Sequence, residues 1–193
     1  MPDDAGKIAK LNLVPANLGQ AQATVPVNGA LVLYKSAMVD PKNPQASLAA
    51  SVKVPQNLKK AIILIVNAGP NANPPYRMVL IDDSPTGFPK GECRVLNLIP
   101  AETAVEAGEH KLPVKPGAMV AIPTVKKKNE FNMAQTNFYM KEGENWNPFT
   151  ERQLQFLDEF RRIFIIHTTP GSNQPFVATI VDTAVAAPPV APN

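Results

Sequence analysis

The chain has 193 residues and a net charge of +3, with 45% hydrophobic and 18% charged residues. This composition is that of a packed globular protein and excludes an intrinsically disordered chain. The small charge excludes the dense basic surface of a nucleic-acid-binding protein, and the longest apolar stretch, residues 61–66, is too short to span a membrane as a helix.

The 21 prolines are spread between short apolar runs, which is typical of many strands joined by turns. Leucines and polar residues alternate near the start of the chain, as in a half-buried strand. In chain order, we expect strands at residues 10–13, 25–27, 30–34, 46–54, 62–66, 76–81, 95–98, 119–122, 131–140, 163–167 and 176–181.

Two turns stand out between these strands. Asn28 and Gly29 form a strong hairpin signal, because both residues tolerate a positive φ. Lys115, Pro116 and Gly117 take the corresponding place further along, where proline sets the first dihedral of a turn and glycine the second. Two different turn sequences at one place indicate that the turn itself is what the fold requires.

An internal repeat relates the two halves of the chain. Five of the six residues from Leu11 to Ala16 are identical to Leu96 to Ala101, and a second match pairs residues 63–82 with residues 163–182. Duplication explains these matches, and similar turn sequences that arose twice are the alternative. We therefore predict an all-β fold of two diverged, roughly six-stranded units in a pseudo-symmetric β-sandwich assembly. The expected bounds are 5–86 and 87–185, followed by a Pro/Ala tail at 186–193.

One segment allows a helix. The residues from Thr150 to Gln153 have the spacing of a capping box, and Leu154, Leu157 and Phe160 then lie three apart. We expect a short helix over residues 151–160. The alternation of Leu154 with Phe156 keeps a strand as the alternative.

Motifs for catalysis or metal binding do not emerge from the sequence. Cys93, His110 and Met119 are ligand types of a blue-copper centre, but a histidine shortly after the cysteine and a second nearby histidine are missing. Asp82 and Asp182 end matching strands, where an aspartate most often begins a turn. We predict no catalytic residue, no metal and no cofactor.

A group of aromatic and amide residues is the best candidate for binding. Trp146 has polar neighbours on both sides, and an exposed tryptophan flanked by amides suits stacking on a sugar or a peptide. A lid over the core is the alternative reading. We take Trp146, Tyr139, Asn145 and Asn147 as the candidate binding residues. Lys126–Lys128 could meet phosphate, although a solvated loop is the more common use of such a run.

Several short segments in the second half of the chain resemble sequences of a class of uncharacterised exported bacterial proteins of β-sandwich type. They are residues 88–98, the Val114 to Gly117 turn, Trp146 and the pair Arg161-Arg162, and the similarity runs from about residue 82 to residue 182. The resemblance implies an envelope location and brings no catalytic residues with it. The acidic residues after Met1 are unlike a signal peptide, yet we expect a periplasmic or extracellular protein rather than a cytoplasmic one.

These observations favour a non-enzymatic structural or protein-interaction protein of the cell envelope or a particle surface. Its partners would be another protein or a second copy of itself. A glycan-binding module that uses Trp146 is the alternative, and a hydrolase of unknown type comes third.

Overall fold

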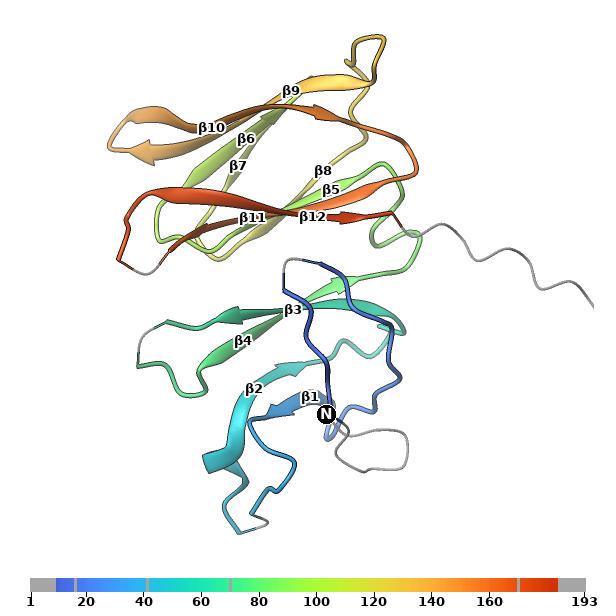
Figure 1. Cartoon of the computed structure of the whole chain (residues 1–193), viewed down its shortest axis with the longest axis vertical. Helices are drawn as coiled ribbons and strands as arrows, with labels where there is room; N and C mark the ends of the chain where they lie inside the picture. Colours follow the sequence, from blue (N-terminus) through green and yellow to red (C-terminus); the bar gives the residue numbers. More distant parts are fainter. Residues whose placement is uncertain (1–9, 16, 41, 70, 170, 184–193) are drawn as a thin grey trace, which may run out of the picture. The chain divides into compact units, whose positions relative to one another are not determined.

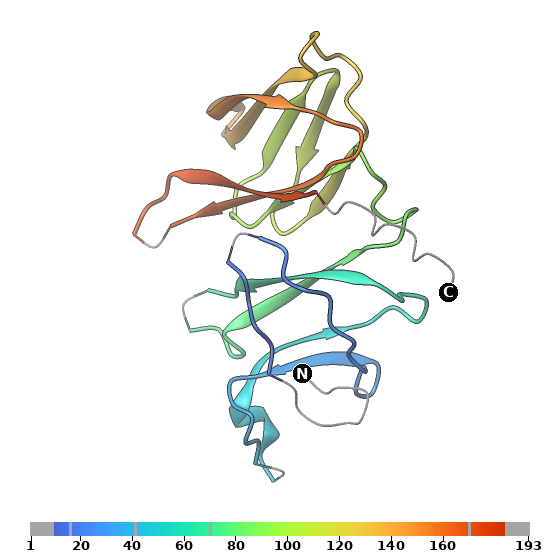
Figure 2. The same ribbon diagram turned by 45° about the vertical axis from the view of Figure 1, so that its right-hand side comes forward.

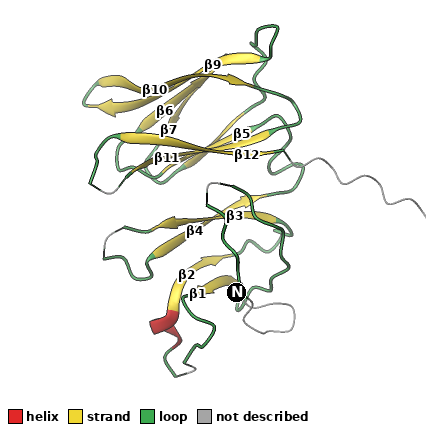
Figure 3. Ribbon diagram, in the orientation of Figure 1, coloured by secondary structure: helices red, strands yellow, loops and turns green. Residues whose placement is uncertain are grey.

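The computed structural model describes residues 10–15, 17–40, 42–69, 71–169 and 171–183, so the tail expected at 186–193 lies outside the described residues. The fold is all-β, as the sequence predicts: twelve strands and one short 3-10 helix, Pro44–Ser47, make up its described regular structure (Figure 3). Within these residues, no helix has the length and apolar character that crossing a membrane requires.

The chain divides into two compact units, with the main boundary between Phe88 and Pro89 and with residues 16–18 assigned to unit 2. The described residues of unit 1 form four strands and those of unit 2 form eight, where the repeat led us to expect about six in each. Unit 1 contains β1 (Ala30–Tyr34), β2 (Leu48–Lys53), β3 (Ala61–Asn67) and β4 (Tyr76–Asp82). Unit 2 contains β5 (Cys93–Asn97), β6 (Thr103–Ala107), β7 (His110–Val114), β8 (Met119–Ile122), β9 (Met133–Glu142), β10 (Asn145–Gln155), β11 (Arg161–Thr168) and β12 (Pro175–Asp182).

Unit 2 is a sandwich of two four-stranded sheets, ordered β10-β9-β6-β7 and β12-β11-β5-β8 (Figures 1 and 2). β5 runs parallel to β11, and the other strand pairs are antiparallel. Its core takes alternate residues from both sheets. Phe138 of β9 meets Phe164 of β11 edge to face, with 5.4 Å between ring centroids, and both rings are fully buried. Such burial of large apolar side chains is the main stabilising term of the sandwich.

Unit 1 is built from two hairpins, β1-β2 and β3-β4, each a two-stranded antiparallel sheet. Leu31 of β1, Ala50 of β2 and Met78 of β4 form a buried core cluster between the hairpins. Half-buried apolar residues of both hairpins pack around these three, Ile63 and Ile65 of β3 among them. The core is much smaller than that of unit 2, since fewer strands contribute to it.

Both predicted turns are confirmed. Asn28 and Gly29 have φ values of 52° and 74°, and the backbone N–H groups of Val27 and Ala30 each donate to the other residue's carbonyl oxygen. Two successive positive φ values are the signature of the type I′ hairpin turn. In unit 2, Gly117 has a φ of 71° at the turn between β7 and β8.

The second sequence match corresponds to two hairpins with the same strand register. Ala61 pairs with Asp82 in β3-β4, and Arg161 pairs with Asp182 in β11-β12. The faces nevertheless differ. In β3 the odd-numbered Ile63 and Ile65 pack on the core of unit 1, whereas in β11 the even-numbered Phe164 and Ile166 belong to the core of unit 2. The two hairpins share their pairing and present opposite faces to their own cores.

The strand expected at residues 10–13 is wrong, because these residues belong to no sheet. In the repeat, Lys10 corresponds to Val95, which is fully buried in the core of unit 2. Burying an unpaired lysine in that place would be costly. Lys10 is instead exposed, Leu11 packs on the core of unit 1, and Leu13 remains 59% exposed.

The helix expected at residues 151–160 is also wrong. Residues up to Gln155 continue β10, where Glu151 pairs with Asn137 and Gln153 with Gln135. Leu154 and Phe156 both pack on the core of unit 2. The segment therefore follows the period-two spacing of a strand, because backbone hydrogen bonding to β9 outweighs a local capping signal.

The two asparagines matched by the repeat should differ sharply in their effect on stability. Fully buried Asn97 donates to the carbonyl oxygens of Ala101 and Val114, at 2.9 Å each, and accepts the backbone N–H of Ile99 at 3.0 Å. Asn97→Ala leaves these groups unsatisfied and should cost about 3 kcal/mol, whereas exposed Asn12→Ala should cost about 0.5 kcal/mol or less. Urea denaturation of both variants measures this, and equal losses would contradict it.

Candidate binding face

The long β9-β10 hairpin places Trp146 and Tyr139 on one side of its sheet. Trp146 lies directly opposite Lys141 on the neighbouring strand. Because directly opposed residues share a face and residues two apart on a strand do too, Trp146, Lys141 and Tyr139 all point to the same side. This side is away from the core, since the alternate residue Phe138 points inward. We call it the outer face of unit 2; Trp146 is 40% exposed on it.

A chain of side-chain hydrogen bonds runs across the outer face. Gln135 Nε2 donates to Asn137 Oδ1 (2.7 Å), and Asn137 Nδ2 donates to the Tyr139 hydroxyl (3.3 Å). The Tyr139 hydroxyl in turn donates to Glu106 Oε2 of β6 (2.9 Å). The bond to Glu106 raises the pKa of Tyr139. The tyrosine is therefore a fixed hydrogen-bond donor rather than a freely rotating ring.

Lysine side chains lie over both aromatic rings. Lys141 Nζ is 5.8 Å from the centroid of the Trp146 ring, and Lys111 Nζ of β7 is 5.7 Å from that of Tyr139. These distances are in the range of cation–π attraction. Lys141 also forms an ion pair with Glu102 at 3.6 Å. The outer face thus combines two aromatic rings with charges of both signs in fixed places.

Asn145 and Asn147, the other two predicted binding residues, lie on the opposite side of the hairpin. Asn147 pairs with Met140, which packs on the core, and Asn145 pairs with Glu142. Asn147 Nδ2 donates to Glu142 Oε2 at 2.8 Å. The structure therefore brings Trp146 and Tyr139 together and separates both asparagines from them.

The sequence prediction missed the charged and amide residues of the outer face. Gln135, Asn137 and Lys141 alternate along β9 with core-facing residues that are apolar except for Thr136, and this period-two pattern could have identified them. Glu106 and Lys111 come from β6 and β7, which were not expected as a hairpin beside β9. Next to the face, at the bulge of β10, is an open hollow of about 320 Å³ lined by residues 148–151.

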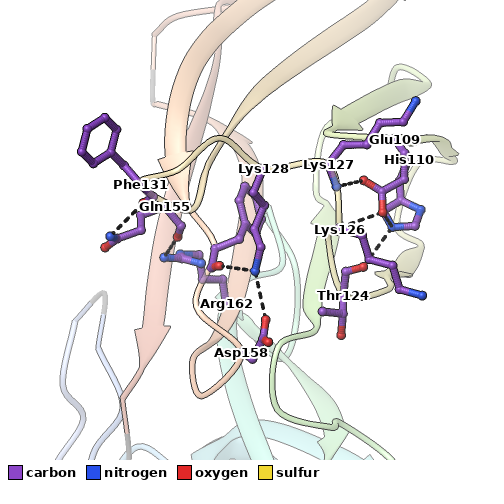
Figure 4. Close-up of polar contacts among 11 residues, drawn as sticks. Glu109, His110, Thr124, Lys126, Lys127, Lys128, Phe131, Gln155, Asp158 and Arg162 are labelled. Carbon is purple, nitrogen blue, oxygen red and sulfur yellow. Dashed lines mark hydrogen bonds and ion pairs between the residues drawn. The ribbon is translucent and has the colours of Figure 1, made fainter.

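The three-lysine loop uses its polar groups to hold the fold (Figure 4). Glu109 accepts the backbone N–H groups of Lys126 (2.8 Å) and Lys127 (2.9 Å). Lys128 Nζ donates to the Phe156 carbonyl oxygen (2.9 Å) and to Asp158 Oδ1 (3.0 Å). These two bonds give the Lys128 ammonium group partners within the protein, so its position needs no phosphate ligand.

The residues considered for copper are placed apart. The Cys93 thiol lies in the core of unit 2, where burial raises its pKa to about 11 against the opposing effect of the Arg162 guanidinium. His110 Nε2 instead approaches Glu109 Oε1 (3.3 Å) and the Thr124 carbonyl oxygen (3.4 Å). Among the described residues, no group of three or more His, Cys, Asp or Glu side chains could hold a metal ion.

Comparison with known protein families and with curated proteins finds no match to this chain.

The Glu109 carboxylate should make stability depend on acid pH. Its hydrogen bonds from Lys127 and Lys126 lower its pKa from 4.5 to about 2. A lowered pKa in the folded state means that the stabilisation is complete above pH 4.5 and is lost as the pH falls towards 2. Glu109→Gln should therefore lower the melting temperature at neutral pH, and its deficit relative to wild type should shrink in acid. The exposed Glu144→Gln is the control, and a deficit that does not change with pH would contradict the assignment.

Trp146 should contribute little to stability. Its side chain is exposed and its ring contacts a lysine on the outer face. Trp146→Ala should change the free energy of unfolding by about 0.5 kcal/mol or less, whereas Phe138→Ala in the core should cost about 3–5 kcal/mol. Denaturant unfolding compares the two variants. A loss of several kcal/mol for Trp146→Ala would mean that the ring seals the core instead.

Proposed function

We propose that the chain is a non-enzymatic interaction protein that binds a protein partner through the outer face of unit 2. The observation that carries this proposal is the placement of Trp146 and Tyr139 on one exposed sheet face beside Lys111, Lys141 and Glu106. Tyrosine and tryptophan are enriched at protein interfaces and supply a large contact area with few rotatable bonds.

The fixed positions of these side chains support the proposal. Asn137, Tyr139 and Glu106 are joined by hydrogen bonds before any partner arrives. Side chains that are already ordered lose less conformational entropy on binding, so more of the contact energy appears as affinity. The two lysines over the rings offer cationic groups to a partner that brings carboxylates, and such complementary charges raise association rates and select partners.

The envelope or a particle surface is the proposed location. The resemblance of residues 82–182 to exported bacterial proteins of β-sandwich type supports it. A periplasmic or extracellular partner is therefore the one to look for.

A glycan ligand is the second candidate, because the two aromatic rings and the amides of Gln135 and Asn137 share one face. Against it, Lys141 and Lys111 lie over the rings on which a sugar would stack. A sugar would have to displace both ammonium groups. A protein partner can keep them as ion-pairing groups, which is why we rank it first.

Site-specific photo-crosslinking in the native host tests the protein partner. A photoreactive residue at position 146 should give one adduct of defined mass, and the same group at Met38, 82% exposed in unit 1, should give none. Lys141→Glu and Lys111→Glu should abolish the adduct at position 146. Equal adducts from both positions, or an adduct that survives both charge reversals, would contradict binding through this face.

A fluorescence titration tests the glycan. Trp146 is the single tryptophan of the chain, so its emission reports on the outer face alone. If the outer face binds a protein rather than a glycan, soluble polysaccharides should leave the emission of Trp146 unchanged. A saturable change that is lost in Tyr139→Ala would instead establish the glycan as the ligand.

A further inference from the structure

β3 (Ala61–Asn67) has one edge that is bound and one that is open. It pairs with β4 along its whole length, and no described residue pairs with its other edge. The strand reads AIILIVN, with no charge, proline or glycine, and its register with β4 has no bulge. An open edge of this composition is a ready template for pairing with another strand.

The other sheet edges of the described chain carry devices that discourage such pairing. Charges, prolines, bulges and short length all serve this purpose. Charged residues occur in β2 (Lys53), β4 (Arg77) and β7 (Lys111), and prolines occur in β7 (Pro113), β10 (Pro148) and β12 (Pro175). β1 has a bulge at Leu33/Tyr34, and β10 has one between Pro148 and Thr150. β8 is short, with the four residues Met119–Ile122. Among the described strands, only β3 lacks every one of these devices, so its edge is the one best suited to pair with another strand.

The hydrogen-bonding phase of the open edge follows from the turns that flank it. The Asp83 N–H donates to the Lys60 carbonyl oxygen (2.9 Å), and the Ala68 N–H donates to that of Pro75 (3.0 Å). Residues that exchange bonds with the neighbour alternate along an antiparallel strand. The even-numbered residues of β3 therefore bond to β4, and the N–H and C=O groups of Ala61, Ile63 and Ile65 point to the open edge.

We propose that this edge is a self-association site, where β3 of one copy pairs antiparallel with β3 of a second copy about a two-fold axis at Leu64. In this register Ile63 faces Ile65 of the second copy, and Ala61 faces Asn67. All of these positions are odd-numbered, so the outward-pointing backbone groups of both strands meet in phase. A two-fold axis makes the contact isologous and closed, which gives a dimer rather than a fibre.

The side chains fit this pairing as well as the backbone does. Ile63 and Ile65 already pack on the core of unit 1 and are half-buried. Cross-strand pairs of β-branched residues stabilise a sheet, and the small core of each unit 1 would continue into that of its neighbour. The register opposes no like charges, because β3 carries none.

Sedimentation velocity and amide hydrogen exchange of the full chain over a concentration series test the proposal. The expected result is a monomer–dimer equilibrium, with Ile63 and Ile65 amides becoming protected as the dimer forms. The amides of Leu64 and Val66 should be protected at every concentration, since they bond to β4. A chain that stays monomeric, or Ile63 and Ile65 amides protected in the monomer, would overturn the proposal; the second result would mean that another segment covers the edge.

Two proline variants separate the edge from the fold. Ala61→Pro removes only an N–H that points to the open edge. It should raise the dimer dissociation constant about tenfold or more, with a melting temperature that equals that of the wild type at concentrations where both are monomers. Ile62→Pro removes an N–H bonded to β4 and should lower the melting temperature. A dimer that survives Ala61→Pro would place the interface elsewhere and overturn the proposal.

Discussion

The contact between Phe138 and Phe164 joins the two sheets of unit 2, and the outer face depends on it. Side chains of a strand alternate between its faces, so an inward Phe138 forces Tyr139 outward. A slip of one residue in the register of β9 would send Tyr139 into the core and expose Phe138. The buried aromatic pair therefore fixes not only the sandwich but also the orientation of every candidate binding residue on β9.

The same alternation explains why residues 10–13 of unit 1 form no strand. Its sequence has a close match to β5, but Lys10 takes the place of fully buried Val95. With lysine at the core-facing position, the segment turns Leu11 to the core and pairs with no strand. Unit 1 is left with two hairpins and with the open edge of β3. Lys10 thus disfavours a further strand at residues 10–13, and no described residue pairs with the second edge of β3.

Much of the fold could be predicted from local pattern, and two of the failures share one physical origin. Turns and alternating strands are local, and the Asn28-Gly29 and Gly117 turns form as expected. The helix over residues 151–160 failed because its capping signal competes with pairing to β9, a contact that the local sequence does not contain. The outer face was found only in part for the same reason. Trp146 is conspicuous in the sequence, whereas Glu106 and Lys111 reach Tyr139 through the pairing of β6, β7 and β9.

The bulge in β10 has two effects: it protects the edge of β10 from pairing with another strand, and it sets which residues of β10 lie on the outer face of unit 2. The register of β10 shifts between Pro148 and Thr150, so the extra residue Phe149 turns to the core together with Thr150. This shift changes which residues face outward. Trp146 before the bulge and Glu151 after it lie on the same face, although the four residues between them would place them on opposite faces of a regular strand. Proline and the bulge also make β10 a poor template for another strand. We propose that a partner binds the face of this sheet, whereas β3, which has no such device, is proposed to pair through its edge.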